Sequence, residues 1–410
     1  LASMLCGQAS TLSEMIGWRI VQGVFGAAVV PLCQATLLDT FPKEKHATAM
    51  SLWGIGVMVG PVLGPTLGGW LTEYYNWRWV FYINAPIGIL SIIGIYLYLP
   101  ETEHRKVRFD ALGFSLLALA VAALQLLVDR GEHVDWFDAI EIRLYLVAIC
   151  AAICLFAVHV RTSSQRFLSP ELLRDVNFVS GLIFIFVVGL VMLATMTLLP
   201  PFLQQWKGYP VATTGLILMP RGLGTIVSMM AVTYLVRVFD TRLLIVAGMC
   251  LTALALHQMS GFTLDVEQRA LVSTGLIQGL GMGLITVPTS ILAFATLAPH
   301  LRNEGAALYS LLRNLGSSIG VSIVMASLTR NLWINQQQLG ERLQLPSGLL
   351  HELNPDNDLM AIPGAIVQEV SRQAAEIAYV NNFHLLTLVT LAAIPLVFLL
   401  SSPAEQRRAA

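Results

Sequence analysis

The chain has 410 residues, of which 56% are hydrophobic and 12% are charged, and its formal net charge is -1. Soluble domains carry about 25% charged residues, so this composition excludes an ordinary soluble enzyme or binding module. A nearly neutral chain without a basic stripe also excludes nucleic acid as the principal partner. The composition instead predicts an all-α polytopic membrane protein that is surrounded by lipid.

Eleven apolar segments are long enough to cross a bilayer, because about 20 residues at 1.5 Å each cover a hydrocarbon core of about 30 Å. They cover residues 14–39, 47–72, 79–99, 110–128, 141–160, 178–203, 212–236, 242–262, 270–297, 305–330 and 383–402. Residues 1–6 look like the end of a further segment. Lys and Arg are more frequent on the side where the first segment ends, which predicts that this side and the C-terminus are cytoplasmic.

The first segment carries an ionisable side chain where a charge is costly. Arg19 is followed one turn later, on the same helical face, by Gln22 and Gly23. A charge, a hydrogen-bonding amide and a close-packing site then lie together, which favours a functional role for the three residues. The alternative is that Arg19 extends its guanidinium to the membrane interface.

The second segment contains four glycines at four-residue intervals. The run consists of Gly56, Gly60, Pro61, Gly64, Pro65, Gly68 and Gly69. Glycines four apart share one helical face, where the missing side chains let a second helix approach closely. Proline is tolerated there because neighbouring helices in a membrane satisfy the freed backbone groups. The segment is therefore expected to be a bent helix that packs tightly on another helix. It is also expected to belong to a protein that changes conformation as it works.

An internal repeat relates the first segment to the ninth and the second to the tenth. Residues 19–26 match residues 275–282, and residues 47–52 match residues 305–311, in the same order and spacing. Parallel repeats of this kind are typical of secondary transporters. Three helices before the ninth segment have no counterpart, so we expect an N-terminal truncation and fourteen helices in a complete protein, including a two-helix insert at 110–160.

Other polar residues inside the segments are further candidates. Arg313 and Asn314 lie deep in the tenth segment, Arg221 follows Pro220 in the seventh, and Gln278 lies in the ninth. Each is a candidate to line a transport cavity, since polar groups inside membranes are usually functional. The alternatives are a buried packing role for Arg313 and, for Arg221, bonding to carbonyls that the proline kink frees.

The sequence contains none of the phosphate-loop, zinc-protease or nucleophile-elbow signatures. All five cysteines lie in apolar segments, and two of them, Cys150 and Cys154, share a helical face without His or carboxylate neighbours, which is weak as a metal site. We therefore expect neither an enzyme nor a metal or cofactor site, and any uphill transport would use an ion gradient.

The longest connection covers residues 331–382 and lies on the predicted extracytoplasmic side. Its interior carries six acidic residues against two arginines. Residues 366–377 repeat apolar positions at helical spacing. Two interpretations remain open for this loop, a docking site for a partner and a lid that packs on its own helical bundle.

Several motifs together resemble the major facilitator superfamily, and specifically its fourteen-span drug:proton antiporters of the EmrB/QacA type. The Arg19, Gln22 and Gly23 cluster resembles the fourth-helix motif, and residues 60–69 resemble the fifth-helix antiporter motif. Residues 76–88 and 127–137 are similar to further motifs of this branch. The resemblance implies drug export coupled to protons, with proton coupling at the first cluster, in the cell inner membrane, with a periplasmic adaptor and an outer-membrane channel as candidate partners.

Some of the family pattern is not present in this sequence. The first-helix carboxylate motif is missing, and Gly275 stands in the ninth segment where the first has Arg19. The resemblance therefore implies that proton chemistry is concentrated in the N-terminal bundle, and that this fragment by itself does not transport.

The principal hypothesis is a proton-coupled multidrug efflux antiporter that exports hydrophobic or amphipathic compounds by alternating access. Its expected parts are residues 1–99 as the rest of an N-terminal six-helix bundle, residues 100–177 as the insert with its loops, and residues 178–410 as the C-terminal bundle. The alternatives are a metabolite or sugar exporter on the same scaffold and a membrane sensor or scaffold that does not transport.

Overall fold

A computed structural model describes residues 1–42, 45–99, 110–131, 134, 136–163, 169–342 and 361–400. The secondary structure of these ranges is helical, without strands. Ten helical segments there have the length and apolar composition needed to cross a membrane. The remaining expected segment corresponds to α4 (His46–Tyr74), a single helix of 29 residues. The expectation of an all-α polytopic membrane protein is confirmed.

The N-terminal group of helices comes first along the chain. It consists of α1 (Ala2–Gln8), α2 (Leu12–Gly26), α3 (Val29–Thr40), α4, α5 (Trp79–Tyr82) and α6 (Asn84–Tyr98). Two expected segments are each divided in two, and proline explains both breaks. The rings of Pro31 and Pro86 would clash with the carbonyls of Ala27 and Tyr82, four residues earlier, so the preceding helices end at or just before those residues.

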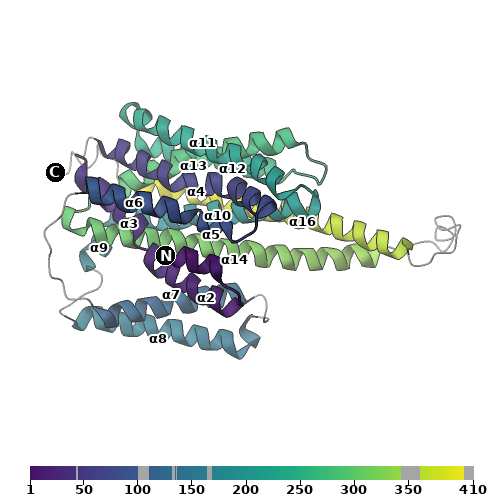
Figure 1. The fold of residues 1–410 in the computed structure, drawn as a ribbon, viewed down its shortest axis with the longest axis horizontal. Coiled ribbons are helices and arrows are strands. Elements are labelled where there is room, and N and C mark those ends of the chain that lie inside the picture. The colour runs from purple at the N-terminus through teal and green to yellow at the C-terminus, as the bar shows by residue number, and fades with distance from the viewer. Residues whose placement is uncertain are drawn as a thin grey trace.

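Two further helices, α7 (Ala111–Gly131) and α8 (Ile140–Thr162), form a pair beside the main body (Figure 1). Asp110 fastens one end of this pair. Its Oδ1 accepts the backbone N–H of Gly113 at 2.9 Å, which caps α7. The same carboxylate lies 2.9 Å from Nε2 of His159 in α8, so one buried acid ties the two helices together.

The C-terminal group contains most of the buried core. It consists of α9 (Pro170–Arg174), α10 (Val176–Pro201), a short π-helix (Phe202–Trp206), α11 (Val211–Val238), α12 (Thr241–Met259), α13 (Gln268–Ala295), α14 (Arg302–Arg342), α16 (Ala361–Ala393) and a short 3₁₀ helix (Ile394–Leu399). Asp175 and Asp240 cap α10 and α12 by accepting backbone N–H groups of the first turn.

Glycines let the helices of this group cross backbone to backbone. A Cβ atom at Gly316 or Gly320 of α14 would collide with the backbone carbonyls of Phe186 or Leu190 in α10. A Cβ atom at Gly279 of α13 would likewise collide with the carbonyl of Arg221 in α11. Such close crossings are typical of membrane helices, whose association depends on van der Waals packing.

α14 and α16 continue beyond the other helices as an antiparallel hairpin, which points to the right in Figure 1. Gln336 Nε2 donates to Ser371 Oγ at 3.3 Å across it. The expected helix at residues 366–377 is confirmed as part of α16, whereas 343–360 lie outside the described residues. We call this end of the molecule the hairpin end.

The base of the hairpin packs on its own bundle. Arg372 Nη2 lies 3.3 Å from Asp265 Oδ1, and Glu376 Oε2 accepts the backbone N–H of Leu264 at 3.0 Å. Lys207 Nζ donates to the carbonyls of Leu264 and Val266 at 2.9 and 2.7 Å. Desolvation, together with the nearby charge of Arg372, lowers the pKa of Lys207 despite the opposing effect of Asp265.

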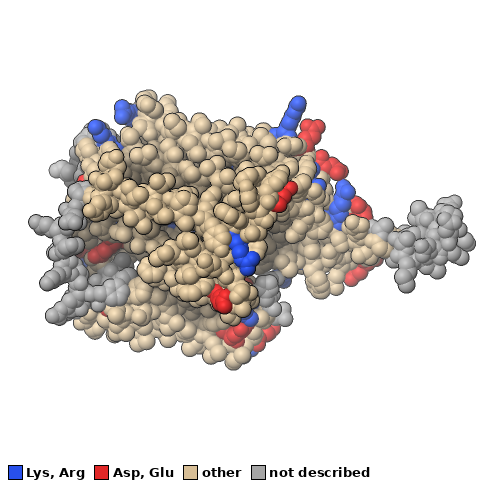
Figure 2. Space-filling view, viewed as in Figure 1, with Lys and Arg blue, Asp and Glu red and all other residues tan. Residues whose placement is uncertain are grey.

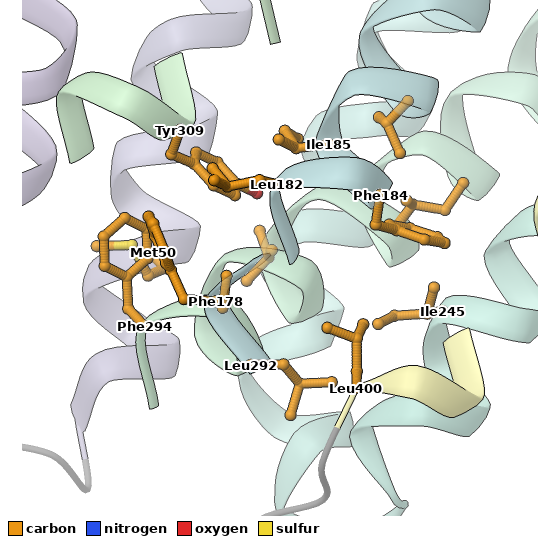
Figure 3. Packing of buried hydrophobic residues seen from close by; sticks show 14 of the residues in the cluster. Met50, Phe178, Leu182, Phe184, Ile185, Ile245, Leu292, Phe294, Tyr309 and Leu400 are labelled. Carbon is orange, nitrogen blue, oxygen red and sulfur yellow. The ribbon is translucent and has the colours of Figure 1, made fainter. Parts of the chain in front are cut away.

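Buried apolar side chains connect the N-terminal and C-terminal groups. Met50 of α4 lies close to Phe178 and Phe294 of the C-terminal group (Figure 3), and all three belong to one buried cluster. Leu38 of α3 belongs to the same cluster. The visible surface is mostly uncharged, and its charged side chains are sparse (Figure 2), as a bilayer requires.

Candidate functional site

The candidate site lies where α4 meets the C-terminal group. Gly54 faces α11 and α13, where an added Cβ would lie 3.0 Å from Met229 Sδ and 3.6 Å from a methyl group of Val287. One turn earlier on α4, Ser51 Oγ accepts a hydrogen bond from Thr233 Oγ1 at 2.9 Å. At these two positions the groups therefore meet through a glycine and a pair of hydroxyl groups, within a contact that is otherwise apolar.

A charged contact joins the groups at the end opposite the hairpin. Arg302, at the start of α14, is 8% exposed. Its Nη1 lies 2.9 Å from Asp39 Oδ1 and 2.9 Å from the backbone carbonyl oxygen of Leu38, both in α3. One guanidinium thus holds the last turn of α3 against the first turn of α14, and it satisfies a helix-end carbonyl as well as a carboxylate.

Arg313, one of the predicted cavity residues, lies at this interface. Its guanidinium carbon is 5.7 Å from the ring centroid of Trp53 in α4, a geometry in which a cation is attracted to the ring face. Tyr309, one turn earlier on α14, is 1% exposed and shares a hydrogen bond of 3.1 Å with Ser290 of α13. A cation and an indole thus meet between the two groups, and a buried phenol lies one turn away on α14.

Asn314, predicted with Arg313, points elsewhere. It is exposed and lines a groove of about 910 Å³ between α7 and α14, whose walls are mainly apolar. Asp129, near the end of α7, accepts hydrogen bonds from Gln125 Nε2 at 2.7 Å and from Ser322 Oγ of α14. This carboxylate therefore ties the end of α7 to α14, one turn beyond the Gln125 and Ser318 that line the groove.

The predicted cluster on α2 is only partly assembled. Arg19 Nη1 donates to Gln22 Oε1 at 3.4 Å, and the guanidinium lies 4.7 Å from the ring centroid of Phe81. Gln22 Nε2 donates to Ser3 Oγ of α1 at 2.6 Å. Gly23 is exposed, and an added Cβ there would have no neighbour within 4 Å among the described residues. Arg19 and Gln22 thus act as one hydrogen-bonded unit.

The glycine stripe of α4 departs from the expectation. At Gly56, Gly60, Gly64 and Gly68 an added Cβ would meet no atom within 4 Å in the part of the chain that the structure describes. The expectation that these four glycines pack tightly on another helix is therefore wrong for this structure. The four glycines make no such contact because of how α4 is rotated about its own axis. It contacts α11 and α13 through a different face, the one that carries Gly54 and Gly69.

Gly69 is the member of the predicted run that does pack closely. An added Cβ at this position would lie 3.1 Å from a methyl group of Val211, at the start of α11. The backbones of Pro61 and Pro65 lie within α4, which is helical throughout, but their side chains are outside the described ones.

Two other predicted cavity residues lie inside the C-terminal group. Arg221 is 7% exposed and donates from Nη2 to the carbonyl of Met192 in α10 at 3.1 Å. Gln278 is fully buried, and neither atom of its amide has a hydrogen-bond partner among the described residues. Arg221 therefore bonds within the C-terminal group, and Gln278 is enclosed by it.

Sequence reasoning missed three residues that connect the two groups, namely Asp39, Arg302 and Trp53, and the buried Tyr309 beside them. One sequence signal could have found the Asp39 and Arg302 pair. The two residues carry opposite charges, and the repeat places the end of the first segment and the start of the tenth on the same side of the membrane. In the described ranges, no group of three or more His, Cys, Asp or Glu residues could hold a metal ion.

Comparisons with known proteins agree with this arrangement of helices. The family description of the Major Facilitator Superfamily matches residues 1–321. The chain belongs to the major facilitator superfamily. The Multidrug export protein EmrB of Escherichia coli K12 is 29% identical over 360 residues, which cover 87% of this chain and 68% of that protein.

A second relative extends over nearly the whole chain. The Fatty acid resistance protein FarB of Neisseria gonorrhoeae is 30% identical over 412 residues, covering 98% of this chain and 81% of that protein. Among solved structures, a bacterial homologue of the human lysosomal transporter Spinster, inward-facing and occupied, covers 97% of this chain and 79% of its own with a TM-score of 0.54. At 16% identity this likeness supports the fold alone.

Membership of this superfamily makes the protein a multi-pass membrane transporter. Transporters of this kind move two bundles of helices against each other around a midplane site. In this major facilitator, the contacts between α3, α4, α11 and α14 are the surface on which such a movement would act.

Proposed function

We propose that this transporter exports hydrophobic or amphipathic drugs in exchange for protons. The alignment with Multidrug export protein EmrB over 360 residues carries this proposal. The similarity to Fatty acid resistance protein FarB widens the proposed substrates to amphipathic compounds in general. The protein resides in the inner membrane with its C-terminus in the cytoplasm, and the proton gradient is its energy source, without a cofactor.

The contact of Arg302 with Asp39 is the proposed cytoplasmic gate. Residues 1–99 and 178–410 form the two bundles, and residues 100–177 form the insert. The gate has to open before a compound from the cytoplasm or inner leaflet can enter between α4 and α14. Arg313 and Trp53 lie on this path. The indole offers an apolar face to the compound, and the guanidinium selects among compounds by their charge.

Arg19 is the proposed coupling residue. A positive charge stabilises an ionised carboxylate brought close to it. If that approach occurs in only one state, protonation and substrate occupancy favour opposite states, which is the condition for exchange. Gln22 supports this role because it accepts a hydrogen bond from Arg19 and holds α1 through Ser3.

The hairpin of α14 and α16 is a proposed docking site for a periplasmic adaptor that leads to an outer-membrane channel. Glu341 and Glu369 are exposed on it, as is Trp333 at 60%. Replacing residues 341–369 by a short Gly-Ser linker should abolish co-purification of the adaptor while the melting temperature stays unchanged, because Arg372 and Glu376 still hold the base. Retained co-purification would remove this role.

Accumulation of a fluorescent drug in cells tests the transport proposal. Cells that express the protein from its complete reading frame should hold several-fold less dye than control cells, and an uncoupler should abolish the difference. A metabolite or sugar exporter would leave dye accumulation unchanged and would instead gain thermal stability in a panel of polar metabolites. A sensor or scaffold would do neither.

A further inference from the structure

Two histidines lie side by side on neighbouring helices of the C-terminal group. The ring of His257 in α12 and the ring of His384 in α16 have their centroids 6.2 Å apart, with an angle of 58° between the ring planes. Both side chains are exposed. Neither residue has a part in the proposed transport site, so the pair needs an explanation of its own.

The backbone positions that carry the two rings are fixed by the core. Leu256, which precedes His257, is fully buried, and Phe383, which precedes His384, is 1% exposed. Both belong to one buried apolar cluster. Packing therefore holds the two helices at this spacing, while the exposed rings can still turn about their side-chain bonds.

The ring nitrogens of both histidines are available to a ligand. Among the described residues, the histidine rings that take part in hydrogen bonds or ion pairs are those of His46, His159 and His300. Those of His257 and His384 do not. A neutral imidazole has one nitrogen that accepts a hydrogen bond or binds a metal ion, so each ring offers one such nitrogen.

The pair also lies where ions in solution can reach it. The 19 residues of α12, Thr241–Met259, give a length of about 28 Å, close to the hydrocarbon thickness of about 30 Å. His257 is in the last turn of this helix. It therefore lies at the boundary of the bilayer, at the hairpin end, where water can supply further ligands to an ion.

We propose that His257 and His384 together bind a divalent transition-metal ion such as Zn²⁺, Ni²⁺ or Cu²⁺. Imidazole nitrogen suits these ions, whereas Mg²⁺ and Ca²⁺ prefer oxygen ligands. Bonds of about 2.0–2.1 Å from one ion to a nitrogen of each ring would place the ring centroids roughly 5–6.5 Å apart. The observed spacing of 6.2 Å thus requires rotation of the rings and no movement of the helices.

The ion in this site would exchange with the solution. Two protein ligands are fewer than the four of a structural zinc site, and water would fill the remaining positions. The bound ion would join α12 to α16, the helix that continues into the hairpin. It would act in addition to the ion pair of Arg372 with Asp265 at the base of the hairpin.

Metal-dependent stability is the first test, and it does not depend on transport. Purified protein without an affinity tag should melt a few degrees higher in Zn²⁺, Ni²⁺ or Cu²⁺, and should not respond to Mg²⁺. His257→Gln and His384→Gln should each abolish the increase, and the double variant should lose no more than either, because the site needs both rings. His300→Gln is the matched control, since it removes an exposed histidine at the opposite end and should keep the full increase.

Electron paramagnetic resonance of bound Cu²⁺ provides a second test, because it reports the number of nitrogen ligands. The wild-type protein should show two nitrogens, and this signal should be lost in either single variant. The proposal is overturned if the wild-type protein melts equally with and without these metals, if either single variant keeps the full increase, or if the copper spectrum lacks two nitrogens. If one variant does not fold, the other variant and the wild-type spectrum decide.

Discussion

Arg302 and Asp39 are 263 positions apart in the chain, yet Nη1 of the first lies 2.9 Å from Oδ1 of the second. The same nitrogen also lies 2.9 Å from the carbonyl oxygen of Leu38. This arginine is the charged link that the structure describes between the end of α3 and the start of α14. α3 belongs to the N-terminal group of helices and α14 to the C-terminal group, so the link opposes separation of the two groups at this end.

Arg302→Ala should favour the state in which the two bundles separate at the Asp39 end. Hydrogen bonds to charged groups contribute about 1.5–3 kcal/mol, and solvent weakens this one because the side chain of Asp39 is 48% exposed. We expect the population of the open state to rise about 5- to 30-fold. Ala35 is 1% exposed. The alkylation rate of a cysteine placed there, in a background without native cysteines, measures the population of the open state.

Exchanging the two charges tests whether the effect is electrostatic. The double variant Asp39→Arg with Arg302→Asp should return the alkylation rate toward that of the parent protein, whereas either single reversal should exceed the effect of Arg302→Ala. The exposed Arg237 serves as the control position, where alanine should change nothing. An equal rate in the parent and in Arg302→Ala would mean that this contact does not hold the bundles together.

Gly316 and Gly60 form a matched pair, because the internal repeat places them on corresponding helices. Gly316→Leu should prevent folding or lower the melting temperature strongly, since a side chain there collides with the carbonyl of Phe186 and overpacking alone costs about 1–3 kcal/mol. Gly60→Leu should leave the melting temperature within about 2 °C, because an added Cβ there meets no described atom within 4 Å. It should still abolish exchange, because leucine prevents the close approach of another helix that glycine permits during the movement. Circular dichroism melts measure stability, and dye efflux measures exchange. A strong loss of stability in Gly60→Leu would contradict the finding that Gly60 is not packed on another helix.

Arg19→Ala should uncouple transport from protons. Dye efflux should fall and should no longer respond to an uncoupler, while expression and melting temperature change little, because Arg19 is exposed and its hydrogen bond to Gln22 is long at 3.4 Å. Arg19→Lys, which keeps the charge, is the matched variant and should retain part of the coupling. Proton-dependent efflux at the wild-type rate in Arg19→Ala would exclude the coupling role.

Lys207 should make the attachment of the hairpin depend on pH. Its pKa is lower in the folded protein than the ordinary value of 10.5, so the unfolded chain binds more protons between the lowered pKa and 10.5. Stability therefore rises with pH in that window, and the increase is complete above about 10.5.

Lys207→Met should start from a lower stability, because two carbonyl hydrogen bonds are lost, and should show a smaller rise between pH 8 and 11. Melting temperatures at half-unit steps of pH measure this difference. Lys45→Met, which removes an exposed lysine outside the hairpin end, should keep the wild-type rise. Identical slopes in the wild type and Lys207→Met would contradict the desolvation of this amine.

The number and type of helices could be predicted because long apolar runs specify membrane helices almost alone. The rotation of each helix could not, since apolar residues on all faces of α4 do not distinguish a helix-facing surface from a lipid-facing one. For that reason the sequence predicts tight packing at the glycines around Gly60. The structure instead shows it at Gly316. Arg19 with Gln22 could be predicted because the pair is local, whereas Arg302 with Asp39 depends on how distant helix ends meet.

Proton and drug movement measured together in one vesicle tests the proposed exchange most directly. Vesicles that contain the protein from its complete reading frame would be loaded with a pH-sensitive dye and given a fluorescent drug under an imposed pH gradient. The proposal predicts drug accumulation driven by the gradient and, without a gradient, proton movement opposite to added drug, both reduced in Arg19→Ala. Drug movement that is independent of the gradient and causes no pH change would contradict proton-coupled export.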